Sequence, residues 1–387
     1  MLRADNKAIK RTASLLSVFL FFAIFLVKPL PADEKPNQQK LEDITVIEKN
    51  EKNSLGLTIL PIFFYTPETK LAFGAGSLFT YRFGLFFKKS RPSTLYLAAI
   101  YTQMKQFSFQ AKPEIYLKNN SIFLTGNFLA ERFPTTFWGI GPNTTESQKE
   151  SYTPQTYFME IGFQQKVLPR SPLYFGFKYH LERTQIREKE PGKLLDQGLV
   201  LGSNGGLLSG PGIIINYDSR DNIFAPSDGL YFQFFGFWND RTFGSDFNYL
   251  SFKADLRQYI SIGRDQVLAW QAVFDNSVGD VPFYKMPKVG GDTILRGYYS
   301  GRFRDRNLAA FQTEFRFPIW KKLSGVVFGA MSSLASRFRD LSWDNLKYAG
   351  GFGLRFRIIP KEKANLRVDF AFGPGTYGIY FKAGEAF

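Results

Sequence analysis

The chain of 387 residues contains no cysteine and one histidine, His180. Without cysteine there is no disulfide framework, no thiolate ligand for zinc and no thiol nucleophile. A single imidazole also excludes a metal site or a mechanism that needs several histidines from one chain. The sequence therefore predicts no metal and no cofactor.

His180 is the remaining candidate for catalysis. It shares its alternating position with Tyr174, Lys178 and Glu182, so we expect it to face a polar interior. No Gly-x-Ser-x-Gly motif accompanies it, and no acidic cluster has the spacing of a calcium loop. We interpret His180 as one more polar interior residue, and we predict no catalytic residues and no enzymatic activity.

After the first thirty residues, no apolar run is long enough to cross a bilayer as a helix. Apolar surface is nevertheless abundant: aromatics make up 17% of the chain, with 43 phenylalanines, while charged residues make up 21%. So much aromatic surface without a spanning helix leaves two fold classes, a large soluble β protein or a membrane β-barrel.

Residues 1–32 have the organisation of a secretory signal peptide. Basic residues precede an apolar stretch at 15–27, and Pro29 and Pro31 break it before Ala32. The alternative is a single membrane anchor, for which the apolar core is short. An exported chain does not meet nucleic acid. Loss of residues 1–32 removes five cations and one anion and lowers the net charge from +15 to +11, which still favours anionic lipid or lipopolysaccharide headgroups as neighbours.

From Leu55 onward, apolar and polar residues alternate with the period of a β-strand. In residues 309–319 the odd positions are apolar or Thr, whereas Gln312, Glu314 and Arg316 stand among the even ones. About sixteen such segments of roughly ten residues follow one another, the length that crosses a bilayer at a tilt. A soluble sandwich also alternates, but this size and repetition predict a transmembrane antiparallel β-barrel.

The connections between these segments alternate between short and long, as in outer-membrane barrels. Short ones lie at 118–120, 168–171, 263–265 and 321–322, and long ones near 132–155, 183–211, 278–306 and 336–346. An even strand count places both barrel ends in the periplasm and starts the 278–306 loop outside. A lumen of this width needs a plug or forms a pore.

The candidate plug lies within that loop, at residues 290–299. Its notable residues are Gly290, Gly291, Leu295, Arg296, Gly297 and Tyr298. Paired glycines, aromatics and a lone arginine between Leu295 and Gly297 are typical of a long loop that folds back and packs. A second motif, at 218–229, contains the turn-forming residues Asp218, Arg220, Asp221, Pro226 and Gly229, and we expect it on the periplasmic side.

These two motifs, the strand at 312–318, the stretch at 137–143 and the last residue, Phe387, together resemble the BamA/TamA superfamily of bacterial surface-antigen barrels. The resemblance runs from about Leu55 to Phe387. It implies a sixteen-stranded barrel in the bacterial outer membrane, with a long outer loop folded into the lumen. It also implies that the arginine matching Arg296 meets acidic residues on the inner wall.

Glu314 is the predicted partner of Arg296, because it stands on the charged face of the next strand. Arginine can bind a carboxylate through two parallel hydrogen bonds, which lysine does not reproduce. The resemblance implies a second acidic partner on the following strand, but residues 325–333 contain no carboxylate. Glu314 therefore acts alone or together with Asp255 or Asp369.

The C-terminal segment 377–387 resembles the signal by which such barrels are themselves inserted, with Tyr377, Gly378, Phe381 and Phe387 as its residues. Alternation places Tyr377, Phe381 and Phe387 on the lipid-facing side, where a terminal aromatic fits the interfacial belt. Gly378 and Gly384 are expected to face inward. They either weaken the seam against residues 57–60 or are ordinary strand glycines.

The expected organisation is a signal peptide at 1–32, a short periplasmic tail at 33–54 and a barrel at 55–387. The tail is too short for the periplasmic POTRA modules of assembly barrels, so the chain resembles the barrel-only branch. The resemblance implies a role in assembling or translocating outer-membrane protein or lipid. The partners would then be client outer-membrane proteins or a separate periplasmic protein. The alternative is a passive pore or a surface antigen or adhesin that keeps only the fold.

Overall fold

The computed structural model describes residues 56–66, 70–81, 91–359 and 363–387. The predicted signal peptide, the tail at 33–54 and Leu55 lie outside the described residues. Within them the regular structure is antiparallel β-sheet with short 3-10 turns in the connections. No described helix is long and apolar enough to cross a membrane.

One sheet of seventeen strands contains sixteen long ones and the three-residue β6 (Thr135–Phe137). The long strands are β1 (Gly56–Thr66), β2 (Lys70–Tyr81), β3 (Ser93–Thr102), β4 (Phe107–Leu117), β5 (Ile122–Arg132), β7 (Glu150–Lys166), β8 (Leu173–Lys189), β9 (Gly205–Asp218), β10 (Gly229–Asn239), β11 (Tyr249–Gly263), β12 (Gln266–Gly279), β15 (Asn307–Trp320), β16 (Leu323–Ala335), β17 (Lys347–Ile359), β18 (Ala364–Gly373) and β19 (Thr376–Ala383). The all-β antiparallel fold and the count of about sixteen strands, both expected from the sequence, are confirmed in the described part of the chain.

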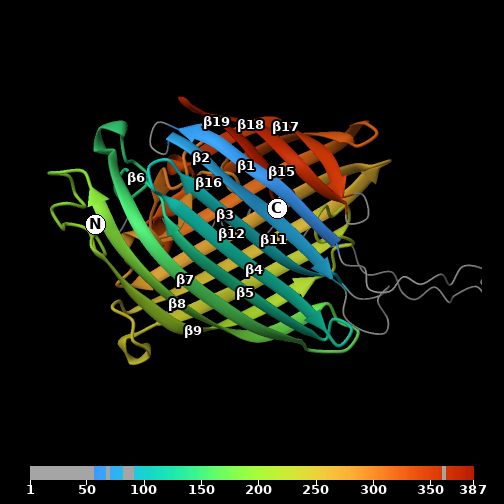
Figure 1. Cartoon of the computed structure of the whole chain (residues 1–387), viewed down its shortest axis with the longest axis horizontal. Helices are drawn as coiled ribbons and strands as arrows, with labels where there is room; N and C mark the ends of the chain where they lie inside the picture. Colours follow the sequence, from blue (N-terminus) through green and yellow to red (C-terminus); the bar gives the residue numbers. More distant parts are fainter. Residues whose placement is uncertain (1–55, 67–69, 82–90, 360–362) are drawn as a thin grey trace, which may run out of the picture.

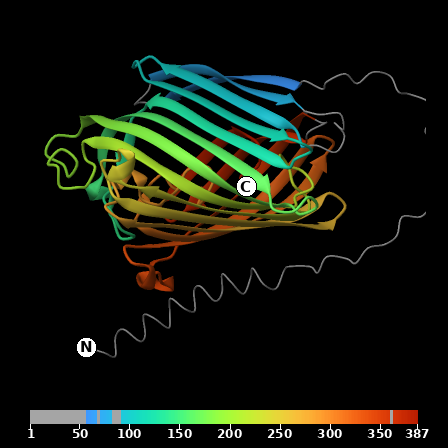
Figure 2. The ribbon, with the colours of Figure 1, turned by 90° about the horizontal axis from the view of Figure 1, so that it is seen from below.

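Each long strand pairs antiparallel with the long strand that follows it, from β1 through to β19. The strands lie obliquely across the molecule (Figure 1), and the view turned by 90° shows the sheet curled around an interior (Figure 2). Among the described residues, no hydrogen-bonded ladder joins β1 to β19. The sheet therefore has a seam between its first and last strands.

The two faces of the sheet have opposite chemistry. On β19, the outward side chains of Tyr377, Ile379 and Phe381 are 75%, 63% and 69% exposed. On β17, Phe352 is exposed whereas Arg355, on the other parity, is buried. Apolar groups outside and charges inside reverse the order of a water-soluble protein, and suit a barrel whose outer face contacts lipid.

The connection between β12 and β15, residues 280–306, folds into the interior, and we call it the inner loop. Two of its segments, β13 (Lys288–Val289) and β14 (Phe303–Arg304), form a short hairpin. An apolar cluster packs this hairpin against the wall; it comprises Val273, Val289, Leu295, Tyr298, Phe303, Leu308, Ala310, Leu334 and Ala349. Burial of these apolar side chains thus holds the inner loop against the wall, independently of its charged contacts.

A second connection, residues 133–149, lies against the inner loop. Gly141 forms a β-bridge with Arg304, and the Arg302 guanidinium donates to the hydroxyl and carbonyl oxygens of Thr144 at 3.0 and 2.9 Å. The Trp138 ring packs edge-on against Tyr299, with ring centroids 5.2 Å apart. Residues 137–146 of this connection therefore pack on the inner loop.

Candidate functional site: a buried arginine–carboxylate cluster

The backbone around Arg296 adopts a tight turn that only some residues tolerate. Leu295 has φ +58°, uncommon for a residue with a Cβ, and its side chain is fully buried in the apolar cluster. Gly297 has φ +112°, and a Cβ there would lie 3.1 Å from the backbone of Phe372. A left-handed residue on each side projects the intervening Arg296 away from the loop and toward the wall.

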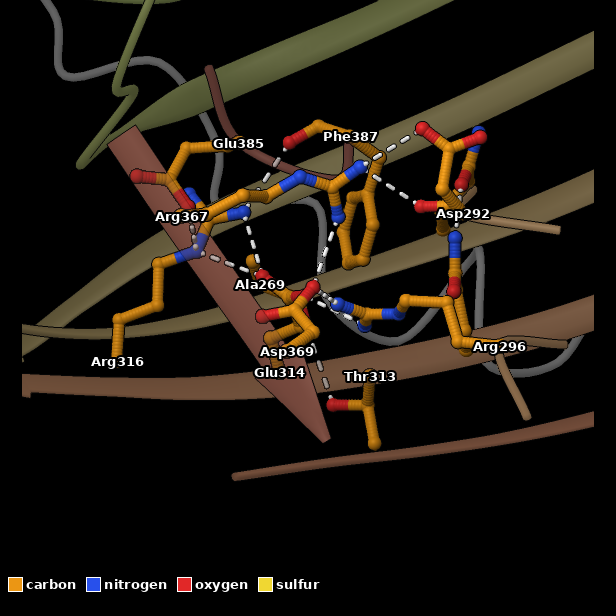
Figure 3. Close-up of polar contacts among 12 residues, drawn as sticks. Ala269, Asp292, Arg296, Thr313, Glu314, Arg316, Arg367, Asp369, Glu385 and Phe387 are labelled. Carbon is orange, nitrogen blue, oxygen red and sulfur yellow. Dashed lines mark hydrogen bonds and ion pairs between the residues drawn. The ribbon is translucent and has the colours of Figure 1, made fainter. Parts of the chain in front are cut away.

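The Arg296 guanidinium is 1% exposed and contacts two carboxylates (Figure 3). One terminal nitrogen donates to Glu314 Oε1 and the other to Asp369 Oδ2, both at 2.6 Å. Its Cζ atom lies 3.5 Å from the ring centroid of Phe328, so the planar cation also stacks on an aromatic face. This fork-shaped contact is one that lysine cannot make.

Glu314 lies on β15, where alternation placed it, and it is fully buried. Of the two candidate second partners, the structure brings Asp369 of β18 to Arg296. Asp255 instead accepts hydrogen bonds from Arg257, at 3.0 and 2.6 Å, and from Gln271 at 2.8 Å. Residues 325–333 lack the second acidic partner of Arg296, and Asp369 on β18, a strand farther along the sheet, takes this role.

Three further arginines surround the same carboxylates. Arg355 donates to Asp369 Oδ1 at 2.5 Å and Arg367 donates to Asp369 Oδ2 at 2.9 Å. Arg316 lies 2.9 Å from Glu314 Oε2. We call the set of Asp292, Arg296, Glu314, Arg316, Arg355, Arg367, Asp369 and Glu385 the arginine–carboxylate cluster. It contains four arginines and four carboxylates, and Lys382 adds a further cation at Asp292.

Sequence reasoning did not assign a role to Arg355, Arg367 or Glu385. The sequence does show that charged residues alternate with apolar ones along β17 and β18, and this alternation places Arg355, Arg367 and Asp369 on the inward face. Parity indicates that a side chain faces the interior, but not which inward charges meet there. For that, the depth of each residue along its tilted strand is needed.

Asp292 ties the start of the Arg296 turn to the same wall. The Arg367 guanidinium donates to its carbonyl oxygen at 2.8 Å and to Oδ2 at 3.2 Å, and the Lys382 ammonium lies 2.7 Å from Oδ2. Burial alone would raise the pKa of this carboxyl. The hydrogen bond and charge of Lys382 and the charge of Arg367 outweigh burial and lower the pKa. The carboxylate is thus held ionised and in contact with β18 and β19.

The inner loop also binds the last strand directly. The Tyr380 hydroxyl accepts a hydrogen bond from the Gly297 amide at 2.9 Å, and Thr376 donates to the Gly297 carbonyl at 2.8 Å. Gly378 makes this possible, because a Cβ there would lie 2.4 Å from the Tyr380 hydroxyl. Gly378 is therefore a packing requirement for Tyr380, whichever effect it has on the seam.

The expectation that Phe387 faces lipid is wrong. Strand β19 ends at Ala383, and Gly384, with φ +88°, turns the chain away from the alternation that the prediction extrapolated. Phe387 is 5% exposed and packs with Tyr259, Val267 and Ala269 of β11 and β12. Tyr377 and Phe381, which precede the turn, do face outward.

Residues 384–387, here called the C-terminal tail, are held by the arginine–carboxylate cluster. Glu385 accepts from Arg355 Nε at 2.7 Å and from the Asn365 amide at 2.6 Å. Arg316 donates to the Phe387 carbonyl oxygen at 3.1 Å, and its Cζ lies 5.6 Å from the Phe387 ring centroid. The tail therefore lies against the arginines of the cluster through Glu385 and Phe387 (Figure 3).

Replacing Phe387 with alanine is expected to release the C-terminal tail. The buried ring supplies most of the apolar contact of these four residues, and removing such a ring costs about 3 kcal/mol. Hydrogen–deuterium exchange of refolded protein should show faster exchange at 384–387. Phe381→Ala, on the outward face of β19, is the matched control and should leave this exchange unchanged. Equal protection of the tail in both variants would contradict the assignment.

The motif at 218–229 forms the β9–β10 turn. Asp218 accepts from the Arg220 guanidinium through both oxygens at 2.9 Å, and also binds Arg91. Asp221 accepts from the Ser227 amide and hydroxyl at 2.8 and 2.5 Å. Burial raises the pKa of Asp221, but these hydrogen bonds outweigh it and lower the pKa. Pro226 is buried, and Gly229, at φ +111°, starts β10.

His180 faces the interior, as its alternation indicated. It is buried and stacks on Phe237 with ring centroids 4.3 Å apart, and its Nε2 lies 2.6 Å from Asn239 Oδ1. These contacts account for the burial of the ring and for the hydrogen bond of Nε2.

The fold and the site define a β-barrel whose long inner loop is fixed to the inner wall by a buried arginine. Residues 73–387 match the Omp85 superfamily domain. The chain belongs to the Omp85 superfamily.

Solved structures of similar fold include BamA from Haemophilus ducreyi lacking POTRA domains 1–3, at 14% identity and a TM-score of 0.56, covering 86% of this chain and 70% of that one. CdiB from Acinetobacter baumannii aligns at 10% identity and a TM-score of 0.55, covering 86% and 59%. CdiB from Escherichia coli aligns at 9% identity and 0.53, covering 85% and 62%. The chain thus spans less than two thirds of either CdiB. No curated protein sequence matched it.

Proposed function

We propose that this protein is a bacterial outer-membrane barrel that assists the assembly or translocation of outer-membrane protein or lipid. The observation that carries the proposal is the connection between the inner loop and the seam. Arg296 binds the carboxylates of Glu314 on β15 and Asp369 on β18. The adjoining Gly297 forms hydrogen bonds with Tyr380 and Thr376 of β19. A loop that binds the strand at the seam can hold that strand in place.

The seam itself supports this role. Strand β1 has 11 residues and β19 has 8, and no ladder joins them in the described part of the chain. An edge strand presents free N–H and C=O groups to any other strand that approaches. In a membrane, where water does not satisfy those groups, a client strand that pairs with the edge gains hydrogen bonds for the backbone groups on its facing side.

Depletion in the native bacterium tests the proposal. We expect depletion to lower the amount of other outer-membrane barrels, or of surface lipid, measured by quantitative proteomics and lipid analysis of isolated outer membranes. Re-expression of the intact protein should restore them, whereas expression of Arg296→Ala should restore them less. Unchanged barrel and lipid levels, together with ion conduction by the purified protein in planar bilayers, would exclude the assembly role.

The second candidate is a passive pore or a surface antigen or adhesin. The packing of residues 133–149 on the inner loop disfavours an open pore, because side chains from both connections fill the same region. Conductance of the purified protein distinguishes the two functions. A pore conducts in the absence of any client, whereas an assembly barrel with its inner loop in place does not.

The proposed partners follow from the same role. Client outer-membrane proteins would meet the seam, a separate periplasmic protein would meet the turns between strands, and outer-membrane lipid or lipopolysaccharide would surround the wall. We propose no enzymatic activity. The buried charges of the site bind one another, and His180 is occupied by Asn239 and Phe237.

A further inference from the structure

A second polar region lies on the side of the inner loop that faces away from the arginine–carboxylate cluster. It is a cavity of about 590 Å³ between the inner loop and the inner wall formed by β3, β4, β5, β7 and β8. Its polar lining includes Asn127, Glu131, Glu182, Lys285, Lys288 and Arg304. This volume is within the range of sites for small solutes.

The charges that line this cavity are unevenly paired. Lys285 is neutralised by Glu182, at 2.7 Å. Within the described residues, Lys288 and Arg304 have no carboxylate within 4.0 Å, and Glu131 has no cation within that distance. Two unpaired cations therefore stand on the inner loop, against one unpaired anion on β5.

Arg304 contributes a hydrogen-bond donor without an acceptor. It is 3% exposed and packs between the rings of Phe137 and Phe283, with its Cζ 5.0 and 5.6 Å from their centroids. One terminal nitrogen donates to the Phe283 carbonyl at 3.2 Å, but Nε has no partner among the described residues. Buried donors without acceptors are costly, so an acceptor at this point would be stabilising.

Lys288 lies across the β13–β14 hairpin from Arg304, and the two are paired in its register. Lys288 is exposed to the interior rather than buried. Desolvation by the surrounding wall, together with the positive charges of Arg304 and Lys285, lowers the pKa of Lys288 to about 8, although the charges of Glu131 and Glu182 act in the opposite direction. A bound anion would relieve the repulsion between these cations. It would also stabilise the ammonium form of Lys288.

We propose that this cavity is a binding site for a small oxyanion, a sulfate-, phosphate- or carboxylate-bearing solute, held between Lys288 and Arg304. An oxyanion offers several acceptors to the ammonium and to the guanidinium at once, as these donors require. The charge of Lys288 acts on Glu131 only from beyond 4.0 Å, so Glu131 favours a solute that also carries a donor or a positive group. The site lies in the interior, between the inner loop and the inner faces of the strands, and away from their lipid-facing side, so the ligand is a free solute rather than the headgroup of a membrane lipid.

Sulfate is the appropriate probe, because its charge does not change near neutral pH. Titration of the purified protein in phosphatidylcholine nanodiscs, followed by calorimetry, should give saturable binding with a Kd of about 1 mM. Lys288→Gln and Arg304→Gln should each weaken binding about tenfold, the loss of one charge-assisted contact, and Lys288→Arg should retain it. Lys253→Gln on β11, which removes the interior partner of Asp275 on β12, should leave binding unchanged.

The pH dependence provides a readout that loss of packing does not produce. Because Lys288 loses its proton near pH 8, sulfate binding to the wild type should weaken between about pH 6.5 and about pH 9.5. Lys288→Gln should bind equally weakly at both. Absence of saturable binding up to about 10 mM, or equal affinity of the wild type and Lys288→Gln, would overturn the proposal. Loss of sulfate binding in nanodiscs that contain phosphatidate would overturn the assignment to a free solute.

Discussion

Asp369→Ala is expected to have the largest effect on stability of any single substitution in the interior. Asp369 is fully buried and accepts hydrogen bonds from Arg296, Arg355 and Arg367. Its removal leaves three buried guanidinium groups with too few anions. Breaking one buried ion pair costs about 3–5 kcal/mol, so we expect at least that loss in the free energy of unfolding.

Urea unfolding of the refolded protein in lipid vesicles, followed by tryptophan fluorescence, measures this loss. Asp340→Ala is the matched control, because Asp340 and Arg339 form an exposed pair at 4.0 Å whose side chains are 49% and 56% exposed. Such pairs contribute at most about 1 kcal/mol. If the two variants lose similar amounts of stability, the buried cluster does not stabilise the barrel in the way its geometry indicates.

Arg296→Ala is expected to detach the inner loop from the wall while the strands of the barrel remain paired. Glu314 keeps Arg316, and Asp369 keeps Arg355 and Arg367, so the wall retains cations. The loop, by contrast, loses its contacts with β15 and β18 and its stacking on Phe328. We expect a loss of about 3 kcal/mol, concentrated in the docking of the loop.

Two measurements resolve this effect. Hydrogen–deuterium exchange should become faster in residues 290–299, and planar-bilayer recordings should show openings that the intact protein lacks. Arg296→Lys should have an intermediate effect, since a lysine keeps the charge but cannot contact both carboxylates in the same plane. Arg132→Ala, at a surface pair with Glu188, is the control. Unchanged exchange at 290–299 in Arg296→Ala would show that the apolar cluster alone holds the loop.

Much of the fold could be predicted from the sequence because strand alternation is local. A period of two residues places each side chain on one face without reference to any other strand. That rule correctly placed Glu314, Tyr377 and Phe381. It failed at Phe387, because the single left-handed residue Gly384 ends the strand and cancels the alternation beyond it.

The candidate site could be predicted only in part. The inner loop, Arg296 and Glu314 were recognisable because they lie close in sequence, on one loop and the strand that follows. Asp369 remained one of two alternatives, since it lies 73 residues from Arg296 and the sequence does not give its depth in the wall. Arg355, Arg367 and Glu385 were inward or terminal charges without assigned partners.

The sequence by itself therefore determined an antiparallel barrel with an apolar exterior and a charged interior, and a loop able to fold into it. Only the tertiary structure decided which interior charges meet. Strand tilt and curvature bring β15, β17 and β18 to one point, where four arginines and four carboxylates meet. The same packing leaves Lys288 and Arg304 without carboxylates on the other side of the loop. The pairing of charges in a low-dielectric interior is a property of the whole arrangement, which no single segment encodes.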